Sequence, residues 1–334
     1  LTLATLINDA PINQWDSSQG TAWRPQNSPP TYGGPTPLRI GLAQSKNVMA
    51  VRVLREVGLE QTREYLTRFG FKMDNLPNSE TIALGSGSLS PLKVAQGYSV
   101  FANGGYYVQA YFIDHVQDAF GNLEFSVAPT MVCRSLCEQS VASNSNQAPK
   151  FAPQVITEQN AFLTRELLYS NIWGGPGWLG TGWRARSLAR QDIGGKTGTT
   201  NDSKDTWYNG FGPGVVASVW VGFDDNRRDL GRTRANTNLG RDQVTGVEAG
   251  AKTAQPAWIE FMQTALKNAP KHDKSIPPNI VKIRIDRESG LLTTKSDSST
   301  MFEYFQSGTE PTEYVQDHVG NSLYTSPSGA EELF

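Results

Sequence analysis

Three closely spaced segments in the second half of the chain predict a β-sheet and restrict the fold more than any other feature. Residues 195–199, 207–211 and 215–223 each have the length of a strand, and the last is apolar almost without interruption. Strands this close in sequence leave no room for a crossover helix, so we expect them to pair antiparallel. A continuous apolar run is typical of a strand covered on both faces, which predicts residues 215–223 at the centre of the sheet.

Helical patterns lie on either side of these segments. Thr36 can cap a helix whose first turn contains Pro37 and which ends at Gly58. A capping serine followed by proline, Ser90 and Pro91, predicts the start of another helix. Further helices are expected over residues 59–68, over 157–173 with Thr157 as the cap, and over 249–268 with a kink at Pro256.

Several segments carry no helical pattern. Proline and glycine are dense enough in residues 14–36 to predict a loop without regular structure. Short strands are expected at 106–108 and 112–116, ahead of a connection at 120–122. Residues 127–155 are rich in Ser, Asn, Gln and Pro, which predicts a mobile loop.

The C-terminal part of the chain differs in composition from the rest. Residues 271–278 are typical of a linker, and the alternating residues 280–285 predict one strand ahead of a polar tail. We therefore divide the chain into a domain of residues 1–270 and a linker with a C-terminal extension at 271–334. The order of elements predicts an α+β fold, in which a helical subdomain packs on a central, mostly antiparallel sheet.

Composition excludes several classes of function. The net charge of −2 argues against a general nucleic-acid binder, and no apolar window has the roughly 18 residues of a membrane span. The three histidines are far apart and in no metal-ligand spacing, so we predict neither a metal site nor a cofactor. The pair Cys133 and Cys137 is open to two interpretations, a local disulfide in an oxidising compartment or free thiols in a reducing one.

The strongest chemical signal is the sequence GKTGTTN at residues 195–201. On an edge strand, Lys196 would place a cation beside an accessible backbone and the hydroxyls of Thr197 and Thr199. That grouping suits the capture of a carboxylate and the placement of a carbonyl oxygen against a backbone N–H. The same residues could also form a simple turn.

A second signal is the triplet Ser45-Lys46-Asn47, which lies between two helical segments. A hydroxyl and an amide two residues apart can face one cleft from a helix–helix corner, where the hydroxyl can relay a proton and the amide can hold a peptide group. Taken alone, Ser45 could equally be an ordinary helix residue. A nucleotide-binding P-loop ending at Lys196 is the alternative from another class, but Arg190 occupies its first glycine position and no apolar helix follows.

Both triplets belong to the S-x-x-K, S-D-N and K-T-G set of the β-lactamases and penicillin-binding proteins. Around them, and over nearly its whole length, the sequence resembles the transpeptidase domain of the class A, bifunctional penicillin-binding proteins, closest to the 1a branch. The resemblance is carried by residues 24–27, 41–48, 83–86, 180–182 with Ala185, 196–200, 205–208, 220–225 and 308–311. It implies the serine β-lactamase/transpeptidase fold.

The resemblance also implies a reaction. A serine would be acylated by a D-Ala-D-Ala stem peptide, release D-Ala, and pass the acyl group to the amine of another strand, while β-lactams would trap the acyl-enzyme. Ser45 would relay the proton to the leaving amine, Asn47 would bind the donor peptide, and Lys196 would supply positive charge. The other implied substrate-binding residues are Thr197, Gly198, Thr199 and Thr200 on the strand, and Gly180, Thr181 and Gly182 in a loop lining the cleft.

The family's S-x-x-K serine is absent from the expected position, since the chain starts after that point. The one internal match is Ser90-Pro91-Leu92-Lys93, which follows Ser45 instead of preceding it and reads as a helix cap. We therefore expect the nucleophile upstream of residue 1 and no catalysis by this chain alone.

The resemblance further implies partners and a location. An upstream glycosyltransferase domain, cell-wall activator proteins and a membrane anchor absent from this chain are expected, with the parent on the periplasmic face of the inner membrane. Two other hypotheses for the function stay open: a penicillin-recognising hydrolase or sensor, and a non-catalytic fragment of a nicked enzyme.

Overall fold

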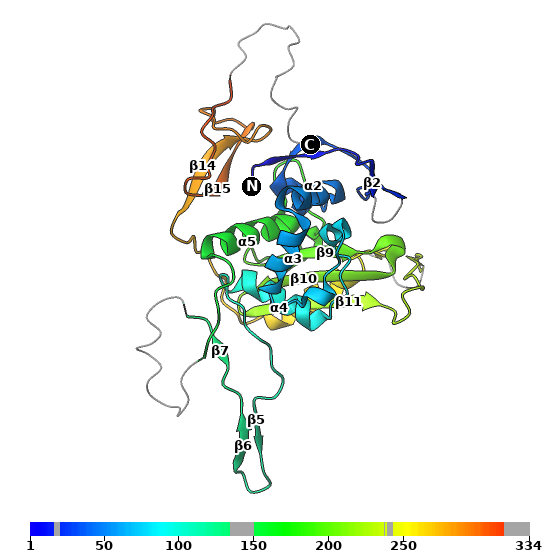
Figure 1. Cartoon of the computed structure of the whole chain (residues 1–334), viewed down its shortest axis with the longest axis vertical. Coiled ribbons are helices and arrows are strands. Elements are labelled where there is room, and N and C mark those ends of the chain that lie inside the picture. The colour runs from blue at the N-terminus through cyan, green and yellow to red at the C-terminus, as the bar shows by residue number, and fades with distance from the viewer. Residues whose placement is uncertain (17–20, 134–149, 237, 239–242, 317–334) are drawn as a thin grey trace.

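The computed structural model of the chain describes residues 1–16, 21–133, 150–236, 238 and 243–316 (Figure 1). The α-helices are α1 (Leu38–Ala43), α2 (Asn47–Val57), α3 (Leu59–Thr67), α4 (Pro91–Ala102), α5 (Glu158–Trp173) and α6 (Ala254–Ala265). Short 3-10 helices are η1 (Met73–Asn75), η2 (Glu80–Leu84), η4 (Trp183–Leu188) and η5 (Asn201–Ser203). In the described part of the chain, no helix has both the length and the apolar character that crossing a membrane requires.

The strands form one three-stranded sheet and several pairs. Their bounds are β1 (Leu6–Asp9), β2 (Gln14–Asp16), β3 (Thr21–Trp23), β4 (Gly34–Pro37), β5 (His115–Gln117), β6 (Leu123–Ser126), β7 (Thr130–Met131), β8 (Lys150–Phe151), β9 (Gly194–Thr199), β10 (Asp205–Gly212), β11 (Val215–Gly222), β12 (Arg232–Thr233), β13 (Gly246–Val247), β14 (Ile280–Asp286) and β15 (Thr300–Gln306). Every pair is antiparallel except β7 with β8.

The three-stranded sheet has the order β11-β10-β9, and its antiparallel pairing is as predicted. Helix α5 packs on one face of β10, where the rings of Tyr169 and Phe211 lie 5.8 Å apart. Helix α6 packs on the other face, where the rings of Tyr208 and Trp258 lie 4.8 Å apart inside the main core. Figure 1 shows α5 running alongside these strands. The predicted arrangement of helices on a mostly antiparallel sheet is confirmed.

The position predicted for residues 215–223 is wrong. Among the described strands, β11 is an outer strand and β10 takes the centre. Residues 215, 217, 219 and 221 of β11 pack against the core that contains α6, while α4 also contacts this strand. An apolar run therefore reports that both faces of a strand are covered, and it does not report the lateral position of the strand.

The predicted helix starts and stops hold at most positions, but Thr36 caps no helix, because it lies in β4 and its Oγ1 donates to Gly34 O. Ser90 caps α4, since its Oγ accepts from Lys93 N, and Thr157 caps α5 by accepting from Asn160 N. The helix expected over 249–268 is shorter, because α6 begins at Ala254. Pro256 thus lies in the first turn, where a missing N–H costs no helical hydrogen bond, and it has no kink to introduce.

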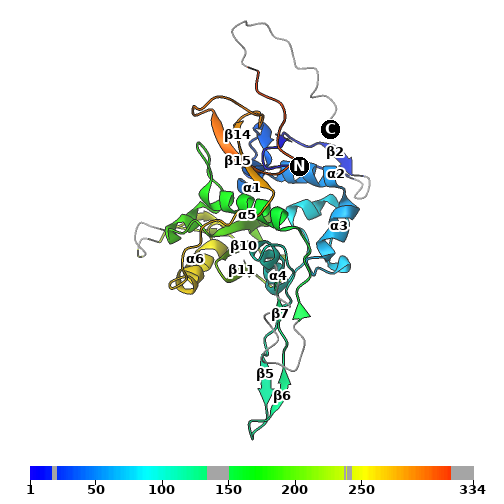
Figure 2. The ribbon, with the colours of Figure 1, turned by 90° about the vertical axis from the view of Figure 1, so that its left-hand side faces the viewer.

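Loop predictions are less accurate. Residues 14–36 contain β2, β3 and most of β4, and residues 127–155 contain β7 and β8, so neither segment lacks regular structure. The strand expected at 106–108 is reduced to an isolated bridge from Tyr106 to Gln154. The strand expected at 112–116 is present in part as β5, and the predicted connection at 120–122 joins it to β6 in a hairpin that Figure 2 shows extending away from the body. The centre of the expected mobile loop, 134–149, lies outside the described residues, and so does Cys137 of the cysteine pair whose state the sequence left open.

The C-terminal extension is more ordered than its polar composition suggests. The predicted strand at 280–285 is present as β14, and it pairs with β15, which the sequence analysis missed. Arg39 of α1 ties this hairpin to the body, because its guanidinium donates to both carboxylate oxygens of Glu303, at 2.6 and 2.5 Å. The same guanidinium donates to Ser170 Oγ at 2.6 Å and to the Glu166 carbonyl at 2.9 Å on α5.

This buried pair gives a test of the packing. Arg39→Met would leave the Glu303 carboxylate, whose side chain is 2% exposed, without its cation. We expect the free energy of unfolding to fall by about 3 kcal/mol, as for other buried pairs that lose one partner. Arg55→Met is the control, because it breaks an exposed pair with Glu80 and should cost less than about 1 kcal/mol. Equal losses of unfolding free energy in the two variants, measured by urea denaturation, would contradict the stabilising role of the buried pair.

Candidate active site

Ser45 occupies a sharp corner between two helices. Helix α1 ends at Ala43 and α2 begins at Asn47, and Ser45 between them has a left-handed backbone with φ of 57°. Ser45 N donates to Leu42 O at 3.1 Å and Lys46 N donates to Gly41 O at 2.8 Å, which closes the turn. A left-handed residue other than glycine costs about 1–2 kcal/mol, so the surrounding contacts must hold it.

Lys196 reaches this corner from the sheet. Its Nζ donates to Ser45 Oγ at 2.7 Å and to the Thr197 carbonyl at 2.9 Å, although the lysine and the serine are 151 residues apart in sequence. The two motifs that the sequence singled out separately therefore meet in one place. The hydrogen bond links a strand to a helix corner, and it lets a proton pass between an amine and a hydroxyl.

The environment of Lys196 changes its acidity. Burial lowers the pKa of the Lys196 ammonium to about 8 from its ordinary value near 10.5, because the charged form loses solvation. Within the part of the chain that the structure describes, no carboxylate forms an ion pair with Lys196. A lysine with such a pKa can both give and take a proton near neutral pH.

The segment Gly180-Thr181-Gly182 lies directly against α5. A Cβ at Gly180 would come within 2.0 Å of the Asn171 carbonyl, so only glycine fits there. Gly182 N donates to that carbonyl at 3.0 Å. Thr181 Oγ1 lies 2.6 Å from Thr197 Oγ1, which joins the loop to β9.

Asn171 is a residue of this site that sequence reasoning missed. Its side chain is fully buried, and Nδ2 donates to Ala43 O and to Thr181 Oγ1, both at 2.8 Å. One amide thus connects α1, the glycine loop and, through Thr181, strand β9. The polar and apolar residues of α5 are interspersed, and Ser170 precedes Asn171, so no local signal in the sequence identified it.

The remaining predicted residues lie on or next to the same strand. Thr199 Oγ1 accepts from Gly250 N at 2.9 Å and can still donate its own proton. Thr200 Oγ1 donates to Asp205 O and accepts from Asp205 N, so this hydroxyl closes the β9–β10 turn. Asn47 Nδ2 donates to Gln26 O at 2.8 Å, which leaves the amide oxygen as an acceptor.

Strand β9 also presents backbone groups. Among the described strands it pairs only with β10, so its second edge is unpaired next to Lys196 and Thr197. An unpaired strand edge offers N–H and C=O groups to an extended peptide. The edge position predicted for the GKTGTTN segment is therefore observed.

Two other candidate sites fail. Residues 194–199 form a strand followed by a 3-10 turn, whereas a P-loop requires a loop that opens a helix.

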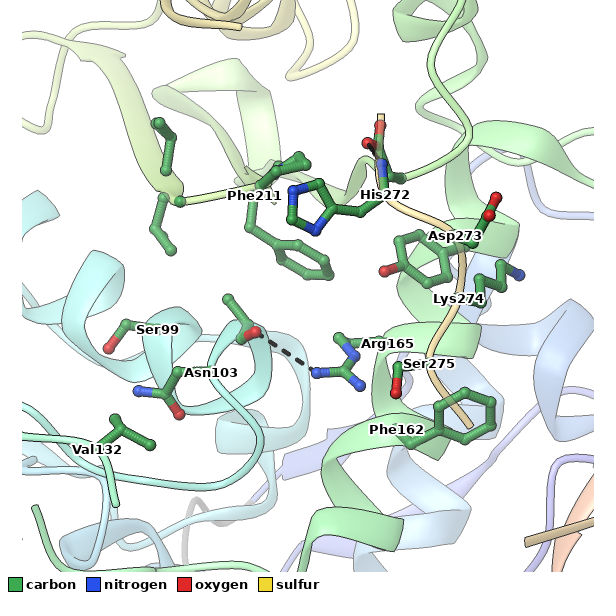
Figure 3. Close-up of a pocket in the computed structure, with 18 of the residues that line it drawn as sticks. Ser99, Asn103, Val132, Phe162, Arg165, Phe211, His272, Asp273, Lys274 and Ser275 are labelled. Atoms are coloured by element: carbon green, nitrogen blue, oxygen red, sulfur yellow. Dashed lines mark hydrogen bonds between the residues drawn. The ribbon is translucent and has the colours of Figure 1, made fainter. Parts of the chain in front are cut away.

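A cavity of about 540 Å³ lies between α4, α5 and residues 272–275 (Figure 3), and no predicted site residue lines it. Two of its charged groups are engaged: Lys274 pairs with Glu166 at 2.7 Å and Arg165 donates to backbone carbonyls. No cluster of metal-binding side chains occurs among the described residues.

Comparison with known proteins assigns the family. A family model described as the penicillin binding protein transpeptidase domain matches residues 3–229, and one described as the penicillin-binding protein 1A C-terminal domain matches residues 276–320. The chain belongs to the penicillin-binding protein transpeptidase family. The resemblance drawn from the motifs is confirmed, while the domain boundary at residue 270 stays a prediction.

Curated relatives carry the same family name. A penicillin-binding protein 1A of Vibrio cholerae is 66% identical over 342 residues, which cover 100% of this chain and 41% of the relative. That of Escherichia coli K12 is 44% identical, covering 100% of this chain and 44% of its own length. The chain thus spans about two fifths of the length of these relatives.

Solved structures agree on the fold. The crystal structure of penicillin-binding protein 1A from Haemophilus influenzae has a TM-score of 0.81 at 42% identity, covering 95% of this chain and 46% of that one. The penicillin-binding protein PonA1 from Mycobacterium tuberculosis has a TM-score of 0.61 at 19% identity, covering 83% of this chain and 66% of that one, which supports the fold alone.

The acidity of Lys196 can be measured directly. Only the neutral amine reacts with acetic anhydride, so the acetylation rate of the Lys196 peptide, followed against pH by mass spectrometry, should have a midpoint of about 8. A free lysine peptide serves as the reference, with a midpoint near 10.4. At a pH between the two midpoints, most of Lys196 is the neutral amine, while most of the reference lysine is still the charged ammonium. Coincident midpoints would contradict the burial argument.

Proposed function

We propose that this chain forms the proton-transfer and carboxylate-binding wall of a serine-type peptidoglycan DD-transpeptidase, which is also the target of β-lactams. The observation that carries the proposal is the 2.7 Å hydrogen bond from Lys196 Nζ to Ser45 Oγ. A transpeptidase must protonate the amine that leaves when the acyl-enzyme forms and deprotonate the amine that attacks it. An ammonium with a pKa of about 8 bonded to a hydroxyl is suited to both steps.

In the proposed reaction, a serine hydroxyl loses its proton to the lysine of its own S-x-x-K segment, its oxygen attacks the carbonyl between the two D-Ala residues, and the C–N bond breaks. Ser45 passes a proton to the leaving nitrogen and recovers one from Lys196. An acceptor amine then attacks the ester and loses a proton to the same relay, and the released serine oxygen recovers its proton from the S-x-x-K lysine. Each step exchanges one acyl bond for another, so no further reactant is needed.

The neighbouring groups suit recognition of the donor. The Thr197 and Thr199 hydroxyls, next to the Lys196 charge, would bind the terminal carboxylate, and the Thr199 N–H would form half of the oxyanion hole. Asn47 would accept from, or donate to, the donor peptide. The free edge of β9 would pair with the extended peptide, and Gly180, Thr181 and Gly182 would line the opposite side. Thr200 contributes through the turn that it closes.

The acylated serine is proposed to lie outside these 334 residues, in an S-x-x-K segment. Ser90 is the one internal match, and its Oγ is occupied in capping α4. The assignment to a synthase and not to a hydrolase or sensor rests on the match of residues 276–320 to a penicillin-binding protein 1A domain. The expected glycosyltransferase domain, activator proteins, membrane anchor and periplasmic location belong to this proposal.

A fluorescent penicillin tests the proposal on the natural, full-length protein. We expect Lys196→Ala and Ser45→Ala each to lower the rate constant of labelling by about 100-fold or more, because each removes a partner of the proton relay. Ser90→Ala is the matched control. It should label at the wild-type rate and lose only about 1 kcal/mol of stability as a helix cap. Labelling that depends on Ser90 but not on Lys196 would refute the proposed function.

A further inference from the structure

The middle residue of the Ser45-Lys46-Asn47 triplet has a partner that the proposed roles do not use. The Lys46 ammonium lies 3.0 Å from Oδ2 of Asp9, and it also donates to the Thr31 carbonyl at 3.1 Å. The Asp9 side chain is fully buried and the Lys46 side chain is 16% exposed. The pair therefore lies inside the molecule, between the end of β1 and the corner that carries Ser45.

Asp9 is held by three donors. Besides Lys46, its Oδ1 accepts from Asn27 Nδ2 at 2.6 Å and its Oδ2 accepts from Gly33 N at 3.0 Å. A carboxylate removed from water requires such partners, because an unpaired buried charge is strongly unfavourable. The position of the carboxylate is thus fixed, and so is the position of the ammonium that it binds.

Asn27 extends this constraint to the first turn of α2. Its Oδ1 accepts from Val48 N at 3.3 Å, one of the N–H groups that have no partner inside a helix. The preceding residue, Gln26, accepts from Asn47 Nδ2 through its carbonyl. The segment that binds Asp9 therefore also holds the start of α2 and the side chain of Asn47.

Ser45 needs support of this kind. Its left-handed backbone, with φ of 57°, persists only where the surroundings determine it. The hydrogen bond from Lys46 N to Gly41 O fixes the main chain of the corner, and the Lys46 side chain fixes it to β1 through Asp9. Without the second contact, the corner could relax toward ordinary helical geometry and move the Ser45 hydroxyl.

We propose that Asp9 is a positioning residue, which holds the Ser45 hydroxyl against Lys196, and Asn47 beside them, through its buried contacts with Lys46 and Asn27. Its own hydrogen bonds go to Asn27, Gly33 and Lys46, so it acts through the corner and not on the substrate. The inference rests on the proposed function, because it assigns Asp9 an effect on the rate of that reaction.

The test separates a rate effect from a stability effect. In the natural, full-length protein, labelling by a fluorescent penicillin yields an amplitude, which is the fraction of molecules that can react, and a rate constant for those molecules. Loss of folded protein lowers the amplitude alone. We expect Asp9→Asn and Lys46→Met each to lower the rate constant about tenfold, measured on the molecules that still react.

A double variant keeps the test informative if a single variant folds poorly. Asp9→Asn with Lys46→Met removes both charges, so no lone charge stays buried and stability should recover relative to Lys46→Met. The rate constant should remain about tenfold low, and the two substitutions should not be additive, because both break the same contact. The control is Arg55→Met, which loosens α2 against η2 at an exposed ion pair and should keep the wild-type rate constant.

The outcomes distinguish the two proposals. Wild-type rate constants in Asp9→Asn and Lys46→Met, or recovery of the rate along with stability in the double variant, would overturn the positioning role and leave the proposed function intact. Absence of labelling in folded wild-type protein would overturn the proposed function, and the positioning role with it.

Discussion

A lysine ammonium withdrawn from water, with one serine hydroxyl and one carbonyl as its partners, is the interaction on which this site depends. Burial of Lys196 is unfavourable for the charged form, and the hydrogen bond to Ser45 offsets only part of that cost. The balance lowers the pKa toward the range where proton transfer in both directions is possible. The surrounding structure must therefore hold Ser45 and β9 in fixed register.

Buried polar side chains supply that rigidity. Asn171 connects α1, the Gly180–Gly182 loop and β9 from inside α5, while Asp9 holds the Ser45 corner from β1. Arg39 of α1 fixes this helix by binding α5 and the C-terminal hairpin. Each makes hydrogen bonds to more than one element, and such connections specify one geometry more sharply than apolar packing alone.

The sequence predicted the parts of the fold that follow from local rules. Caps at Ser90 and Thr157, the glycine at residue 58 and the antiparallel strands at 194–222 each have a nearby physical cause, and they were found. The strands β4 and β15 and the outer position of β11 depend on partners outside their own segments, which no local pattern encodes. The strands β2 and β3 pair with each other, and the proline and glycine elsewhere in 14–36 concealed them. Pro256 was misread because its effect depends on its distance from the start of the helix.

The site residues also divide into those that the sequence identified and those that only the structure reveals. Ser45, Asn47, Lys196 and Thr197 were identifiable because their residue types form motifs with known chemistry. Asn171 and Asp9 form no motif, since their importance comes from burial and from the backbone groups that they happen to face. Charge and hydrogen-bond satisfaction become visible only once the segments are brought together.

The most direct test of the central claim is a crystal structure of the natural, full-length protein after reaction with a penicillin. We predict an ester on a serine outside these 334 residues. We also predict the penicillin carboxylate within hydrogen-bond distance of the Thr197 and Thr199 hydroxyls, with the Ser45–Lys196 pair beside the opened ring. A penicillin bound away from β9, or an ester on Ser45 or Ser90, would contradict the proposed role of this site.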